Sequence, residues 1–151
     1  MKIVCPRLNL TLLEATGKKV TFLQHIVDLL DLKDVQVIHD RAETTGRSPE
    51  HRESYDLVLA RAVAELAVLA EYALPFCSLG GRVIAQKGHD AQVEVMGAER
   101  AIKLLGGTLI YMLNVEIPGL AESRSLIVIG KVARTPDDYP RRPGAPNKKP
   151  L

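Results

Sequence analysis

Three ionisable side chains, Glu14, Arg61 and Lys87, stand directly after runs of apolar residues that have the length of buried strands. In an open parallel sheet, ligands bind beyond the carboxyl ends of the strands. These three positions are therefore the first candidates for contacts to a ligand. The two neighbours that follow Glu14, Ala15 and Thr16, would line the same strand end.

Glu14 has the position of an acid that ends a strand just before a helix. Such a carboxylate can accept hydrogen bonds from both hydroxyls of a ribose. The alternative is a solvated loop acid, or an acid placed near the start of a helix, where the helix dipole favours negative charge. Thr16 is expected to cap that helix. The position of Glu14 does not separate the two interpretations.

The segment Arg41-Ala42-Glu43 follows the next predicted strand. A small residue and a carboxylate at this point could border an adenine ring, with a backbone amide reading the edge of the ring. The alternative for Glu43 is an acid in the first turn of a helix.

Arg61 and Lys87 are cations at the ends of two further buried strands. A charge seldom ends a strand rich in Val and Leu without a partner. Arg61 could face the carboxylate of a cofactor, or the substrate; an ion pair with Glu65 is the structural alternative. Lys87, followed by Gly88, could face a substrate, or it could be an ordinary surface lysine.

The apolar patterns predict alternating strands and helices that would position these residues. We expect strands at 10–14, 35–39, 55–60, 82–86, 108–116 and 125–131, and helices at 18–30, 64–75 and 91–105. We also expect a possible short helix within 43–54, a turn at 79–81, a helix stop at 106–107 and a turn at 118–119.

This order predicts an α/β fold with a mainly parallel sheet. The last two strands have no helix between them, which predicts one antiparallel strand at the end of the sheet. That ending is typical of class I (Rossmann-like) methyltransferases, whereas an ordinary dinucleotide-binding fold more often keeps alternating.

The last segment, 135–151, holds five prolines and four basic residues and is predicted to be an irregular tail after a domain at 1–134. Its cations are Arg141, Arg142, Lys148 and Lys149. Cations on a segment stiffened by proline could bind phosphates at little ordering cost. The alternative is a disordered basic tail that keeps the protein soluble.

The composition is that of one globular domain, with 46% hydrophobic and 25% charged residues among 151. A net charge of +2 neither requires nor excludes a nucleic-acid partner, and 4% aromatic residues argue against reading single strands by stacking. No apolar run approaches the roughly 20 residues of a membrane span. Cys5 and Cys77 are expected to be buried free thiols of a cytosolic protein. The histidines lack metal-ligand spacing, so no metal is expected.

Short motifs over the whole chain, in this order and spacing, resemble the bacterial small-subunit ribosomal RNA guanine-N7 methyltransferases, the RsmG or GidB family. The motifs are Leu12-Leu-Glu-Ala-Thr-Gly-Lys-Lys with Phe22-Leu, Arg41-Ala-Glu, Asp56-Leu-Val-Leu-Ala-Arg-Ala-Val-Ala, Leu74-Pro-Phe with Gly80-Gly, Gln86-Lys-Gly, Arg124-Ser-Leu-Ile-Val-Ile, and Tyr139-Pro-Arg-Arg-Pro-Gly-Ala-Pro-Asn-Lys-Lys-Pro-Leu.

The resemblance implies transfer of a methyl group from S-adenosylmethionine to N7 of a guanine in 16S ribosomal RNA, in the cytoplasm. The partner would be 16S ribosomal RNA or the small ribosomal subunit. By the same resemblance, Glu14, Ala15 and Thr16 would lie near the cofactor ribose, Ala42 and Glu43 would flank the adenine, and Arg61 would lie near the methionine end or the RNA. The RNA contacts would be Lys87, Arg141, Arg142, Lys148 and Lys149.

The chain departs from the family pattern at its start. The family has a helical N-terminal region, a first central strand and a Gly-rich loop around the cofactor, and none of these matches residues of this chain. The absence of a central strand would leave two unpaired strand edges and an exposed core. Two further hypotheses are a non-catalytic fragment that retains RNA binding and a class I methyltransferase of another substrate. A nicotinamide dehydrogenase would also suit Glu14, but the chain has no GxGxxG motif.

Overall fold

The computed structural model describes residues 1–88, 90–116 and 124–151. It forms two compact units, residues 1–42 and residues 43–151, each of which is described by itself. The predicted turn at Pro118-Gly119 lies outside the described residues.

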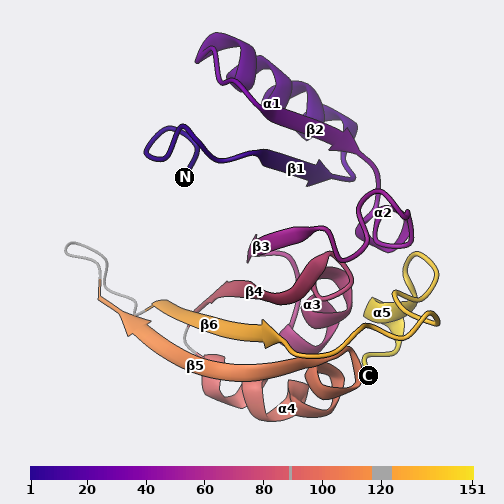
Figure 1. The fold of residues 1–151 in the computed structure, drawn as a ribbon. Helices are drawn as coiled ribbons and strands as arrows, with labels where there is room; N and C mark the ends of the chain where they lie inside the picture. The colour runs from indigo at the N-terminus through magenta and orange to yellow at the C-terminus, as the bar shows by residue number, and fades with distance from the viewer. Residues whose placement is uncertain (89, 117–123) are drawn as a thin grey trace. The chain divides into compact units, whose positions relative to one another are not determined.

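The first unit is a strand–helix–strand motif (Figure 1). Strand β1 (Leu10–Glu14) pairs in parallel with β2 (Val35–His39), and helix α1 (Gly17–Leu29) connects them. The pairing is in register along the whole length of both strands, from Leu10 opposite Val35 to Glu14 opposite His39. The predicted order of strand, helix and strand is thus confirmed, with both strands at the predicted bounds and the helix shifted by one residue.

The second unit is a four-stranded sheet with helices. Its elements are α2 (Ala42–Thr45, which begins at the last residue of the first unit), β3 (Tyr55–Arg61), α3 (Leu66–Ala73), β4 (Cys77–Lys87), α4 (Ala91–Leu104), β5 (Gly107–Val115), β6 (Arg124–Lys131) and α5 (Ala145–Lys148). The strand order is β3-β4-β6-β5. β3 and β4 are parallel, and β6 is antiparallel to both of its neighbours. The predicted α/β class and the antiparallel strand of the closing pair are therefore confirmed.

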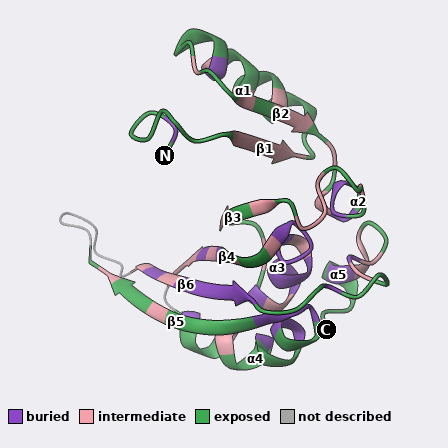
Figure 2. Cartoon of the chain, viewed as in Figure 1, coloured by how far each residue is buried: buried purple, intermediate pink, exposed green. Residues whose placement is uncertain are grey.

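The core of the second unit lies between α3, α4 and one face of the sheet. Leu66 and Leu74 pack there with Val83, Ile127 and Ile129, all at most 1% exposed. Strand β6 is largely buried, whereas β5 and β3 are largely exposed (Figure 2). The burial pattern explains why the sequence of β6 is a continuous apolar run.

The glycines at 80 and 81 lie within β4 and do not end it, so the predicted turn at 79–81 is wrong. Gly80 has a φ of +81°, which is unfavourable for any residue with a Cβ atom. A Cβ atom at Gly81 would lie 2.8 Å from the carbonyl oxygen of Asp56. The pairing with β3 shifts register here, between Tyr55 and Leu57. The two glycines therefore let the strand bend and continue.

Four strands have one neighbour each among the described residues: β1 and β2 in the first unit, and β3 and β5 at the two edges of the second sheet. β1 pairs only with β2, and β3 pairs only with β4. Leu57 and Leu59 of β3 point away from the helices, beside Arg82 and Ile84, and are 39% and 48% exposed. A parallel strand of this composition is normally covered on both faces. The unpaired edges and exposed apolar residues expected from the lack of a central strand are thus present.

The residues beyond 134 pack against the second unit and form the short helix α5. Thr135, Pro140 and Pro146 are buried. The segment is mostly irregular, as expected, but it is not a separate tail, because side chains distant in the sequence bind its backbone. No helix within the described ranges is long and apolar enough to cross a membrane.

The two cysteines differ in environment, so the expectation that both are buried is correct only for Cys77. Cys5 is exposed, in the irregular segment before β1. Cys77 is 0% exposed, and its burial raises the pKa of its thiol from 9.0 to about 11.

We predict that a thiol reagent such as dithionitrobenzoate modifies only Cys5 quickly in the native chain, and both cysteines in guanidinium. Because the folded state raises the pKa of Cys77, its contribution to stability is lost as the pH rises from about 9 to about 11. The measurement is the number of fast-reacting thiols at neutral pH, with Cys5→Ser as the control. Rapid reaction of Cys77 in that variant would contradict the packing of the second unit.

Candidate functional site

Glu14 lies at the carboxyl end of β1, where its carboxylate accepts from the backbone of the turn that follows. Its Oε1 accepts a hydrogen bond of 2.8 Å from the amide of Thr16, and its Oε2 lies 3.7 Å from Nζ of Lys19. The amide of Thr16 is the main cause of a lowered pKa of Glu14. A charged carboxylate is therefore fixed at the strand end, with Oε2 directed toward a cation.

Thr16 is at the N-cap position of α1, as predicted, but its side chain does not form the cap hydrogen bond. Its carbonyl accepts from the amides of Lys19 and Val20 at 2.9 and 3.0 Å. On the neighbouring strand end, Nε2 of His39 lies 3.3 Å from the carbonyl oxygen of Ala15. The carbonyl group of Ala15 and the ring of His39 are therefore polar groups at the same strand end as Glu14.

Glu43 has a different environment from the one the sequence suggests. The residue is 4% exposed, and its Oε1 accepts a hydrogen bond of 2.8 Å from the amide of Gly144. That partner lies 101 residues further along the chain, beyond the reach of a local sequence argument. The carboxylate of Glu43 is therefore occupied by a structural contact, which leaves Ala42 and the backbone of both residues to border a ligand.

Arg61 and Lys87 lie at the carboxyl ends of two paired strands, since Arg61 stands opposite Gln86. Arg61 is exposed, and the described residues show no ion pair between it and Glu65. The next residue, Ala62, has a φ of +54°, so the chain turns sharply after β3.

The side chain of Lys87 contacts both the loop after β3 and helix α4. Its Nζ donates to Oε2 of Glu94 at 2.6 Å and to the carbonyl oxygen of Ala64. Glu94 also accepts from the amide of Leu66 at 2.7 Å. Lys87 therefore fixes the loop after β3 against α4.

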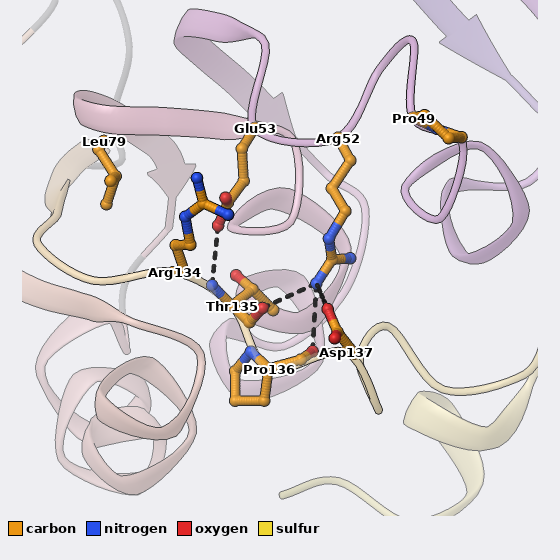
Figure 3. A pocket seen from close by; sticks show the side chains of 8 residues that line it. All are labelled: Pro49, Arg52, Glu53, Leu79, Arg134, Thr135, Pro136 and Asp137. Atoms are coloured by element: carbon orange, nitrogen blue, oxygen red, sulfur yellow. Dashed lines mark hydrogen bonds and ion pairs between the residues drawn. The ribbon is translucent and has the colours of Figure 1, made fainter.

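A depression of about 750 Å³ lies near the start of β3 and β4, away from their carboxyl ends (Figure 3). It is lined by Pro49, Arg52, Glu53, Leu79, Arg134, Thr135, Pro136 and Asp137. Glu53 accepts from the amide of Thr135 at 2.8 Å, and Arg52 donates to the carbonyl oxygen of Thr135 at 2.8 Å. These groups bind one another, so the depression is not the candidate site.

The four cations of the C-terminal segment fall into two kinds. Arg141 donates from Nε and one terminal nitrogen to the carboxylate of Glu71, at 2.9 and 2.6 Å. Arg142, Lys148 and Lys149 are exposed. Sequence reasoning missed Glu71, which lies within a helix that reads as purely apolar packing. Among the described residues, no three His, Cys, Asp or Glu side chains gather as metal ligands.

Several solved structures with a similar architecture are methyltransferases. A predicted O-methyltransferase from Agrobacterium tumefaciens has a TM-score of 0.63 at 17% identity, covering 83% of this chain and 64% of that one. An rRNA methylase from Streptococcus thermophilus has a TM-score of 0.58 at 13% identity, covering 82% and 73%. The fold is that of the class I methyltransferases.

The chain belongs to the rRNA small subunit methyltransferase G family, whose model matches residues 1–125. It is 56% identical over all 151 residues to the ribosomal RNA small subunit methyltransferase G of Roseiflexus castenholzii and 51% identical to that of Chloroflexus aggregans. It spans 64% and 63% of the length of these two relatives.

We predict that Lys87→Gln lowers the free energy of unfolding by about 1–2 kcal/mol, because Glu94 and the carbonyl oxygen of Ala64 lose a charged donor. Denaturant unfolding measures the change. The control is Lys103→Gln, an exposed lysine on α4, the helix that carries Glu94. This substitution should change stability by less than about 0.5 kcal/mol. Equal effects of the two substitutions would mean that the contacts of Lys87 with Glu94 and Ala64 do not form in solution.

Proposed function

We propose that the protein to which these residues belong transfers a methyl group from S-adenosylmethionine to N7 of a guanine in 16S ribosomal RNA. The observation that carries the proposal is the 56% identity over all 151 residues to a relative named for small-subunit ribosomal RNA methylation. The class I methyltransferase fold supports it, as do the ionisable residues Glu14 and Arg61 at the carboxyl ends of strands.

The environment of Glu14 fits the ribose of the cofactor. Oε1 is used by the turn, and Oε2 can accept a hydrogen bond from a ribose hydroxyl, with Ala15 and Thr16 beside it. Arg61, exposed at the end of β3, is placed in the proposal near the methionine carboxylate or the RNA. Since the carboxylate of Glu43 binds Gly144, the proposal gives the adenine contact to the backbone of Ala42 and Glu43.

The chemistry asks little of the protein beyond positioning. Guanine N7 carries an in-plane lone pair and no proton, so no general base is required. S-adenosylmethionine supplies the methyl group on its sulfonium sulfur. The residues at the strand ends would hold the reacting atoms in line, which is where most of the rate enhancement would arise. Lys87 would act by holding the loop that follows Arg61.

The RNA partner, whether 16S ribosomal RNA or the assembled small subunit, would be met by the cations of the chain. In this proposal residues 1–134 form the methyltransferase part, and residues 135–151 add basic side chains for phosphate contacts.

A second candidate applies to the 151 residues on their own: a non-catalytic RNA-binding form. The observation that favours it is the single neighbour of β1 and of β3 among the described residues. In the described residues, no strand pairs with the edge of β1 opposite β2 or with the edge of β3 opposite β4, and such open edges suit a form that does not hold a cofactor.

The test of the reaction is methyl transfer to small-subunit RNA by the chain and by a version extended to the length of its relatives. Mass spectrometry of the digested RNA should find 7-methylguanosine with the extended version. A methylated product of another kind would point to a different substrate atom, and no product from a folded extended version would refute the proposal.

We predict that Glu14→Ala in the extended version weakens S-adenosylmethionine binding about tenfold or more, since a charged hydrogen bond is lost. Calorimetric titration gives the dissociation constant. Glu99→Ala, an exposed acid on α4, is the control and should leave the dissociation constant unchanged. Unchanged affinity in Glu14→Ala would remove the ribose assignment.

A further inference from the structure

Three carboxylates from separate parts of the second unit hold the backbone of the C-terminal segment, residues 135–151. Glu53 accepts from the amide of Thr135, Glu71 from that of Arg141, and Glu43 from that of Gly144, each at 2.8 Å. Glu43 and Glu71 are 4% and 1% exposed. A hydrogen bond from an amide to a carboxylate shielded from water is among the stronger ones in a protein.

Two arginines bind the same segment through its carbonyl oxygens. Arg47 donates to Pro140 at 2.7 Å and to Asp138 at 2.8 Å. Arg52 donates to Tyr139 and to Thr135, both at 2.8 Å. The segment has little regular secondary structure, so these side chains take the place of the missing backbone ladder.

Arg141 belongs to this set of anchoring contacts. Glu71 is almost fully buried, and a buried carboxylate is costly unless a charged donor satisfies it. The hydrogen bonds from Arg141 to Glu71 are also the main cause of the raised pKa of Arg141. The guanidinium of Arg141 is thus used to fix the chain.

The other three cations project from one compact stretch. The amide of Ala145 donates to the carbonyl oxygen of Arg142 at 3.0 Å, and the amide of Lys149 donates to that of Ala145 at 3.0 Å. Arg142, Lys148 and Lys149 are exposed, so their charges are available to an external polyanion.

We propose that residues 142–149 form a preordered phosphate-binding surface for RNA, in which Arg142, Lys148 and Lys149 contact phosphates and Arg141 is the anchor that positions them. The inference rests on the proposed function for its partner, RNA. A segment that is already fixed loses less conformational entropy on binding than a disordered tail, so three cations can contribute usefully to affinity.

The experiment measures binding of the 151-residue chain to a fluorescent RNA hairpin over a range of KCl concentrations, without cofactor. The triple variant Arg142→Gln/Lys148→Gln/Lys149→Gln should reduce the slope of log K against log salt by about 2–3, the release expected for three phosphate contacts. The double variant Glu71→Met/Arg141→Met removes the anchoring charge without leaving a buried carboxylate, and it should keep the wild-type slope. Circular dichroism verifies that each variant is folded.

The control is Arg100→Gln/Lys103→Gln, two exposed cations on α4, which should leave the slope unchanged. The proposal is overturned if the chain does not bind the hairpin, if the triple variant keeps the wild-type slope, or if the double variant loses about one unit of slope. The binding assay contains no cofactor, so its result does not depend on the proposed reaction. If the slopes are as expected but the extended version transfers no methyl group in its own assay, the proposed reaction is refuted and the phosphate-binding surface is not.

Discussion

The pairing of β-strand edges is the constraint on which the rest of this structure depends. Every backbone amide and carbonyl of a buried strand needs a partner, and in the described residues β1 and β3 each have a partner on one side only. Leu57 and Leu59 on β3 are 39% and 48% exposed, because they occupy the face of the strand that does not pack on the core of the second unit. The strand ends that carry Glu14 and Arg61 are formed, and one edge of each of their strands is open in the described residues.

Charged side chains stabilise the second unit where regular secondary structure ends. Lys131 is 1% exposed and donates to the carbonyl oxygens of Leu74 and Leu105 at 2.8 and 3.2 Å, with Oε1 of Glu53 at 3.3 Å. Burial is the main cause of its lowered pKa. Lys131 also donates to the hydroxyl of Thr135. Together with the Glu71–Arg141 pair, this contact makes the C-terminal segment part of the folded unit, so several of its polar residues make structural contacts besides any contact with RNA.

Much of the fold could be predicted because the apolar runs have the period of their elements. The strands at 10–14 and 35–39 and the helix starting at 91 occur as predicted. The turn predicted at Gly80 and Gly81 is wrong, because a glycine pair suits a bent strand as well as a turn. The partners of Glu43 and Arg141 could not be predicted, since they lie 101 and 70 residues away and depend on tertiary packing. The position of Glu14 at a strand end was predicted from the apolar run before it. Its hydrogen bond from the amide of Thr16 is local, only two residues away, but the residue pattern does not specify it.

The most direct test of this account is calorimetric titration of S-adenosylmethionine into the folded 151-residue chain and into a version extended to the length of its relatives. The account predicts one-to-one binding by the extended version and binding at least about tenfold weaker by the 151-residue chain, since its strand ends lack an enclosing neighbour. Equally tight binding by both would contradict the claim that the open strand edges limit the site.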